Sequence, residues 1–157
     1  MSRAFTREED NEAIADIGER PVSQHRNLVT ERGLALIETE LAELREALGE
    51  AERQEDRERL ASVSRDLRYW TARRETAELS VPEPGSDVVR FGMVVTLENE
   101  DGKTVHWRIV GEDEADPAKG TISHVSPMAQ ALFGKAVGDL VGVNGKEWEI
   151  VGLTTKG

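Results

Sequence analysis

The stretch TERGLALIETELAELREALGEAERQEDRERLASVSRDLRYW, from Thr30 to Trp70, contains two apolar seams separated by a charged segment. Within each seam the apolar residues recur at spacings of three and four, which places them on one face of a helix. The first seam consists of Leu34, Ile37, Leu41, Leu44 and Leu48, and the second of Leu60, Val63, Leu67 and Trp70. Thr30 is a suitable N-cap for the first helix.

The positions of the two seams mirror each other about Gln54. Two helices that fold back on one another, with a turn near Arg53 to Asp56, would therefore pack seam against seam along their whole length. Each arm would have about 21 residues and reach about 32 Å at about 1.5 Å per residue. A two-helix finger buries too little apolar surface to stand alone, so the sequence predicts a base that supports it.

The remainder of the chain predicts that base. Strand-like segments alternate with turn signals from residue 87 onward, and Asn144-Gly145 is the pair preferred in tight β-hairpins. Ser126 as the N-cap and Pro127 at the first helical position mark the start of a short helix, and Gly134 marks its end. The fold class is α+β: an antiparallel helical hairpin followed by a small antiparallel sheet with one helix. We expect a disordered tail over residues 1–28, the hairpin over 29–80 and the sheet domain over 86–157.

Composition limits the class of protein. The chain has 157 residues, no cysteine and a net charge of -11, so disulfides, thiolate metal sites and cysteine nucleophiles are excluded. Residues 1–29, 30–80 and 81–157 carry -2, -4 and -5. Because no segment is basic, we expect a protein partner with a basic surface rather than bare nucleic acid. No apolar run suits a membrane span or a secretion signal, which favours a cytoplasmic location.

Several segments resemble the Gre family of bacterial transcription elongation factors over about residues 27–153. They are VTERGLALIETELAEL, RYWTAR, RFGMVVTLENEDG, RIVGEDEAD and, the most specific, ISHVSPMAQALFGKAVGD. The resemblance implies a coiled-coil hairpin on an FKBP-like domain. That domain would dock on the rim of the RNA polymerase secondary channel, and the hairpin tip would help to hold a second Mg²⁺ in the polymerase's own active centre. The chain would thereby regulate elongation by stimulating cleavage of backtracked RNA. The chain would then be neither an enzyme nor the holder of its own cofactor, and nucleic acid would meet it only within the polymerase complex.

The resemblance assigns roles to particular residues. Polymerase docking falls on Val125, Ser126, Pro127 and Met128. A purely structural role, the capping of a helix, explains Ser126 and Pro127 as well. One family subgroup has an aspartate in place of Val125, so an ion pair made there would be absent from this chain.

At the hairpin tip the family's signature is missing, and Glu55 and Asp56 are the remaining candidates as metal ligands. The hairpin is also shorter than the family's by roughly 18 residues, or about 13 Å of reach. A role for Asp56 as the N-cap of the second helix competes with the metal role. A regulator that occupies the channel without stimulating RNA cleavage is therefore the alternative function.

Four arginines of the second helix form a candidate basic face toward RNA: Arg65, Arg68, Arg73 and Arg74. Ion pairs with interleaved acidic residues explain them equally well. His25, His106 and His124 lack metal-ligand spacing, so no intrinsic metal site is expected.

Two other functions remain open. The leucine seams suggest a coiled-coil adaptor, although the mirrored register predicts that they pair within one monomer. Prolyl isomerisation would need an aromatic-lined pocket in the base, for which the chain offers Phe91, Trp107, Phe133 and Trp148.

Overall fold

The computed structural model describes residues 18–156 of the chain. Its elements in chain order are β1 (Leu28–Val29), α2 (Glu31–Arg53), α3 (Arg57–Thr76), β2 (Glu78–Leu79), β3 (Val94–Asn99), β4 (Thr104–Val110), the 3₁₀ turn η1 (Pro117–Lys119), β5 (Thr121–Ser123), α4 (Pro127–Leu132), β6 (Leu140–Val143) and β7 (Lys146–Thr154). The predicted disorder of residues 1–28 falls largely on residues 1–17, which lie outside the described residues.

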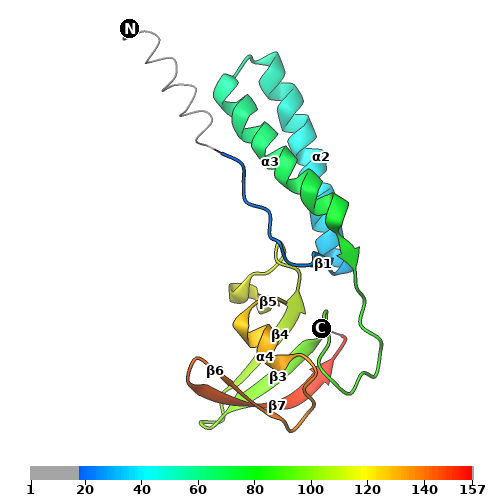
Figure 1. Ribbon diagram of the computed structural model, residues 1–157, viewed down its shortest axis with the longest axis vertical. Coiled ribbons are helices and arrows are strands. Elements are labelled where there is room, and N and C mark those ends of the chain that lie inside the picture. Colours follow the sequence, from blue (N-terminus) through cyan, green and yellow to red (C-terminus); the bar gives the residue numbers. More distant parts are fainter. Residues whose placement is uncertain (1–17, 157) are drawn as a thin grey trace. The chain divides into compact units, whose positions relative to one another are not determined.

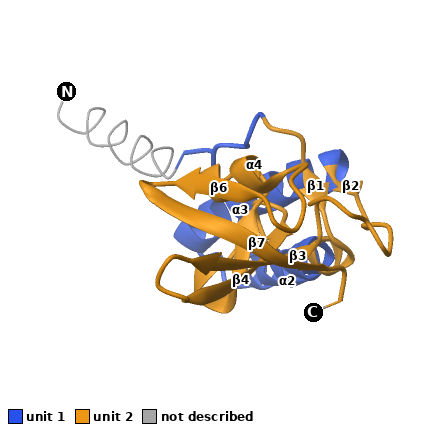
Figure 2. Cartoon of the chain, turned by 90° about the horizontal axis from the view of Figure 1, so that it is seen from below, with its two compact units in different colours: residues 1–24, 36–76 blue, residues 25–35, 77–157 orange. Residues whose placement is uncertain are grey.

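The described chain divides into two units, which have different colours in Figure 2. The hairpin unit contains residues 18–24 and 36–76, and the sheet unit contains residues 25–35 and 77–156. The division therefore falls inside α2, so the first turn of that helix belongs to the sheet unit rather than to the hairpin.

In the hairpin unit, α2 and α3 lie side by side and run in opposite directions (Figure 1). An ion pair between Glu38, near the start of α2, and Arg74, near the end of α3, links the two helices. Seam residues are buried on both helices, namely Ile37 and Leu41 of α2 and Val63 and Trp70 of α3. The antiparallel hairpin predicted from the mirrored seams is confirmed, and its turn falls between Arg53 and Arg57 as expected.

The sheet unit contains a five-stranded sheet in the order β5-β4-β3-β7-β6. Neighbouring strands are antiparallel except for β4 and β5, which pair in parallel from Arg108 and Thr121 to Val110 and Ser123. The expected sheet was wholly antiparallel. The difference arises because the loop of residues 111–120, with the η1 turn capped by Asp116, returns the chain to the level of Arg108, so that β5 runs beside the last three residues of β4 in the same direction. Such a crossover is what a parallel pair requires.

Tight turns complete the sheet as the sequence predicts. Asn144 and Gly145 join β6 to β7 with φ of 53° and 76°, the left-handed values of a two-residue hairpin.

A second sheet was not predicted: β1 and β2 pair in parallel through only two residues each. Their pairing brings Arg26 within 2.9 Å of Glu78, an ion pair on the surface of the sheet unit.

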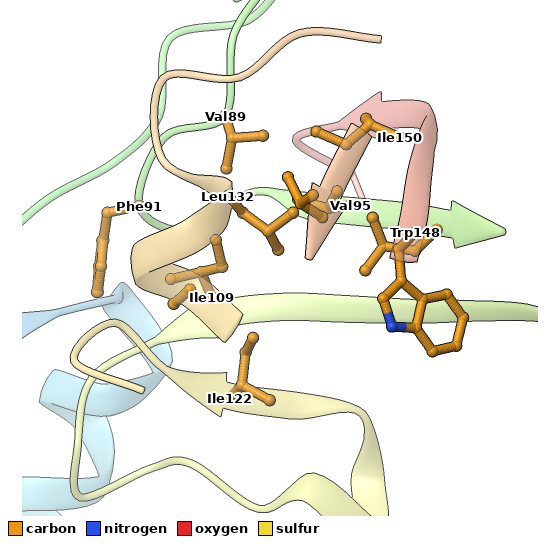
Figure 3. Packing of buried hydrophobic residues seen from close by; sticks show 11 residues of the cluster. Val89, Phe91, Val95, Ile109, Ile122, Leu132, Trp148 and Ile150 are labelled. Atoms are coloured by element: carbon orange, nitrogen blue, oxygen red, sulfur yellow. The ribbon is translucent and has the colours of Figure 1, made fainter. Parts of the chain in front are cut away.

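The core of the sheet unit lies between the sheet and α4. Figure 3 shows Leu132 of α4 among apolar side chains from the strands, including Val95 and Ile109. These three side chains are fully buried. Trp148 and Phe91 belong to the same cluster, and Trp107 and Phe133 pack against it. Packing of α4 on this core determines where its N-terminus lies.

Candidate functional site

The predicted docking residues form the turn that leads into α4. Ser126 caps the helix, because its Oγ accepts a hydrogen bond from the Ala129 amide at 3.2 Å. The turn is held from both sides: the Ser126 amide donates to the Ser123 carbonyl at 3.0 Å, and Gln130 Nε2 donates to the His124 carbonyl at 2.7 Å. The capping role predicted for Ser126 is thus present in the structure, and the turn is well ordered by its own hydrogen bonds.

This turn offers a small, largely apolar surface. Pro127, the first residue of α4, is exposed, whereas Val125 and Met128 are half-buried, and Met128 packs against the core. Because position 125 carries no carboxylate, docking through this turn would rest on shape and apolar contact rather than on an ion pair at that position. Whether the four residues bind a polymerase stays a prediction.

The hairpin tip is built from two helix-capping motifs in succession. At the end of α2 the Glu55 amide donates to the Glu52 carbonyl at 3.2 Å, and the Asp56 amide donates to the Ala51 carbonyl at 3.1 Å. This Schellman pattern requires a left-handed residue, and Glu55 occupies it with φ of 53°. Asp56 then caps α3, because its Oδ1 accepts from the Arg59 amide at 3.1 Å.

These caps restrict what the tip carboxylates can do. One oxygen of Asp56 is already used by the backbone of α3, and Glu55 stands where glycine is usual. Both side chains are exposed. Residues 18–156 contain no group of three or more histidine, aspartate or glutamate side chains that could hold a metal ion. The donor set at the tip therefore does not form a metal site within this chain.

Glu55→Gly is expected to raise the free energy of unfolding by about 0.5–1 kcal/mol. Glycine removes the cost of about 1–2 kcal/mol of a left-handed L-residue, partly offset by its greater freedom in the unfolded chain. Gln54→Gly is the matched control, because Gln54 has no positive φ and should only be destabilised. Urea unfolding followed by circular dichroism measures both. Equal losses of stability in the two variants would contradict the assignment of the cap.

Three of the four arginines in the predicted basic face of α3 form ion pairs with carboxylates. Arg68 Nη2 lies 2.6 Å from Glu19, Arg65 Nη2 lies 3.2 Å from Asp66, and Arg74 pairs with Glu38. The hydrogen bond from Arg68, opposed by desolvation, lowers the pKa of Glu19 below its ordinary value. Sequence reasoning considered only acids on α3 and missed Glu19 and Glu38, which are distant in sequence.

The fourth arginine behaves differently. Arg73 is only 1% exposed, so in this structure it adds no guanidinium to the surface of α3. Its place on the helix gave no signal of burial, since it lies outside the leucine seam. The proposal of an RNA-facing role therefore rests on Arg65, Arg68 and Arg74, each of which has a carboxylate partner.

A second set of residues, missed by sequence reasoning, anchors the start of α2 within the sheet unit. Glu114 Oε2 accepts hydrogen bonds from the amides of Thr30 and Gly111, both at 3.2 Å. Its Oε1 accepts from Thr30 Oγ1 at 2.6 Å. A Cβ on Gly33 would lie 2.1 Å from Oε2, so this close approach requires glycine. A glycine in the first turn of a strongly predicted helix was the available signal.

The structure offers little for a prolyl isomerase. All four aromatic side chains that such a pocket would need are in the core or packed against it. A concavity that includes Trp148 is otherwise lined mainly by carboxylates, those of Glu98, Glu100, Glu147 and Glu149.

None of the helices in residues 18–156 is long and apolar enough to cross a membrane.

Comparison with known proteins identifies the family. A family model described as the C-terminal domain of the transcription elongation factors GreA and GreB matches residues 83–154, which include β3 to β7 and α4. The chain is 45% identical over 86 residues to the elongation factor GreB of Pasteurella multocida, and this match covers 54% of each protein. The chain thus spans about half the length of that relative.

A longer match covers both hairpin and sheet units. The chain is 34% identical over 153 residues to the elongation factor GreA of Desulfovibrio desulfuricans, which covers 87% of this chain and 94% of that protein. Among solved structures, the GreA factor homolog Gfh1 of Thermus thermophilus covers 82% of this chain and 99% of its own, with a TM-score of 0.41 and 24% identity. Given the identity to GreA through most of both sequences, the chain belongs to the GreA/GreB family of transcription elongation factors.

Proposed function

We propose that the chain binds RNA polymerase at the rim of the secondary channel and regulates elongation from there. The observation that carries this proposal is the turn before α4. It lies inside the region that matches the family model, it is held in place by the Ser126 and Gln130 hydrogen bonds, and it leaves Pro127 exposed. A preorganised apolar turn loses little conformational entropy when it docks.

Charge supports a protein partner over free nucleic acid. The chain carries a net charge of -11. Of the predicted basic face, Arg65, Arg68 and Arg74 are paired with carboxylates, and Arg73 is buried. Binding to bare duplex requires unpaired cations that displace counterions. The chain would therefore meet nucleic acid only inside the polymerase complex, and it would act on the polymerase's active centre rather than as an enzyme.

Co-purification tests the binding. The full chain is incubated with core RNA polymerase at low salt and the mixture is separated by size. We expect the chain to elute with the polymerase, and complete separation of the two would overturn the proposal. The same column, run with the chain alone, should give a monomer of 17.4 kDa, because the seam residues that an adaptor would present are buried or half-buried within one hairpin and none of them is exposed.

Within this function, we favour regulation by occupancy of the channel over stimulation of RNA cleavage. Delivery of a ligand requires an oxygen within about 2.0–2.1 Å of Mg²⁺, which a shortened hairpin does not readily provide. The match to the Desulfovibrio GreA has 153 aligned positions, more than the 87% of this 157-residue chain that they cover. This chain therefore lacks residues that the relative has, as a shortened hairpin would require. The cap formed by Asp56 further limits that carboxylate.

Stalled, backtracked elongation complexes test this preference. We expect RNA shortening in the presence of the chain to proceed at the rate of the polymerase alone. If the chain accelerates it, Glu55→Gln and Asp56→Ser decide the ligand, because serine keeps the cap of α3 but removes the carboxylate. Acceleration that disappears in either variant would contradict the occupancy model and identify the ligand.

A further inference from the structure

The strand β6 forms one edge of the five-stranded sheet, and its outer side is open. It is the last strand in the sheet order and lies beside β7 (Figure 1). Val143 and Lys146 flank the two-residue turn, so they form a hydrogen-bonded pair of the ladder. Because such pairs alternate along antiparallel strands, the N–H and C=O groups of Gly142 and Leu140 point away from β7. An extended chain could therefore pair with this edge.

Exposed aliphatic side chains gather along the same edge. Residues 86–156 have three large hydrophobic side chains that are exposed, those of Val137, Leu140 and Val151. Leu140 begins β6 and Val151 belongs to β7. The Gly138 amide donates to the Ile150 carbonyl at 2.8 Å, which brings Val137 beside Val151. Aliphatic groups that cluster on one part of a surface are typical of an interaction site.

Carboxylates that lack a cationic partner lie next to these aliphatic groups. A concavity of about 200 Å³ includes Leu140 in its lining, together with four exposed glutamates, Glu98, Glu100, Glu147 and Glu149. Within residues 18–156 none of the four forms an ion pair. Glu98 and Glu149 are direct cross-strand neighbours, and like charges in that arrangement repel each other. A cationic group from a partner would relieve this repulsion.

Gly142 leaves a passage between the open edge and these carboxylates. It lies opposite Glu147 in the ladder, and the nearest atom to a Cβ built on it is the Lys146 carbonyl oxygen, at 4.0 Å. Packing therefore does not require glycine at this position. A lysine or arginine on a strand added to β6 could extend over Gly142 toward Glu147, because neighbouring strands are only about 4.8 Å apart.

We propose that β6 binds an extended segment of a partner protein that carries lysine or arginine at alternate positions. The segment adds a strand to the sheet through hydrogen bonds with Gly142 and Leu140. The methylene groups of its cationic side chains cover Leu140, and their charged ends reach Glu147 and Glu149. A second copy of this chain fits poorly, because it would bring the same carboxylates to the edge. The proposal does not depend on docking of polymerase at the α4 turn, which involves other residues.

Hydrogen exchange in the isotope-labelled, full-length chain tests the pairing. The probe is a short capped peptide of alternating lysine and threonine, and the control peptide has glutamate in place of lysine. At a concentration about ten times the dissociation constant, the lysine peptide should slow exchange of the Gly142 and Leu140 amides by about tenfold. The Val141 amide, which faces β7, should change little. The glutamate peptide should protect none of them.

Two sets of variants separate the roles of charge and backbone. Replacement of both carboxylates, Glu147→Gln with Glu149→Gln, should weaken binding of the lysine peptide by about fivefold or more. Gly142→Pro removes the outward N–H, a change that edge strands tolerate, and should abolish protection of the Leu140 amide. Gly142→Ala is the matched control because it keeps the N–H, and it should bind as the native chain does. Circular dichroism checks that each variant is folded.

Three results would overturn the proposal. The first is a lysine peptide that protects neither Gly142 nor Leu140 in the native chain, a result that needs no variant to fold. The second is equal affinity of that peptide for the native chain and for the variant with both glutamines. The third is protection of the β6 amides that appears without peptide as the concentration of the chain rises, which would assign the edge to a second copy.

Discussion

Gly33→Ala is expected to lower the free energy of unfolding by about 2 kcal/mol in the native chain but to raise it by about 1 kcal/mol when Glu114 is alanine. The new methyl group would lie 2.1 Å from Glu114 Oε2. The carboxylate can rotate away, and it would then lose its bonds to the amides of Thr30 and Gly111. Hydrogen bonds to charged groups each contribute about 1.5–3 kcal/mol, which exceeds the gain in helix propensity of about 1 kcal/mol.

Without the Glu114 carboxylate only the gain in propensity remains, so the sign of the effect changes. Urea unfolding of the four proteins in this double-mutant cycle measures the coupling. Gly49→Ala is the matched control, because Gly49 also lies in α2 and the nearest obstacle to its Cβ is the flexible end of Arg53, at 3.5 Å. It should stabilise both backgrounds. A Gly33→Ala effect of the same sign with and without Glu114 would contradict the anchoring role of that carboxylate.

Pro127→Asp is expected to weaken binding to RNA polymerase by about tenfold or more while leaving the folded chain intact. Pro127 is exposed at the first position of α4, where an acidic residue is well tolerated. The helix and its Ser126 cap therefore remain. In the complex, however, the new carboxylate would be desolvated against an apolar contact without a partner, which costs more than the 1.4 kcal/mol that corresponds to tenfold affinity.

Pro84→Asp makes the same substitution at another exposed proline of the sheet unit, outside α4. Dissociation constants with core polymerase and thermal unfolding curves are measured for both variants. We expect equal midpoints of unfolding and a loss of affinity in Pro127→Asp alone. Equal affinities in the two variants would exclude the α4 turn from the docking surface without affecting the family assignment.

The predictable features of this protein depend on residues that are near one another in sequence. Helical spacing predicted both arms of the hairpin, and their mirrored positions predicted the turn. Thr30, Ser126 and the Asn144-Gly145 pair were recognised because caps and tight turns are formed by a few consecutive residues. The competing roles of Asp56 were also recognised, and the structure contains the cap.

The features that could not be predicted depend on contacts between distant residues. Glu114 reaches Thr30 across 84 positions and Glu19 reaches Arg68 across 49, so no local pattern relates the partners. Burial of Arg73 and the parallel pairing of β4 with β5 likewise follow from how complete elements pack.

By itself, then, the sequence determined the helices, the turn of the hairpin and the tight turn between β6 and β7, because these reflect local backbone preferences and the period of the apolar residues. Only the tertiary structure decided which charges are paired, which glycine must lack a side chain and which tip carboxylate is already in use. Those outcomes depend on distances of a few ångströms between segments that local preferences do not bring together.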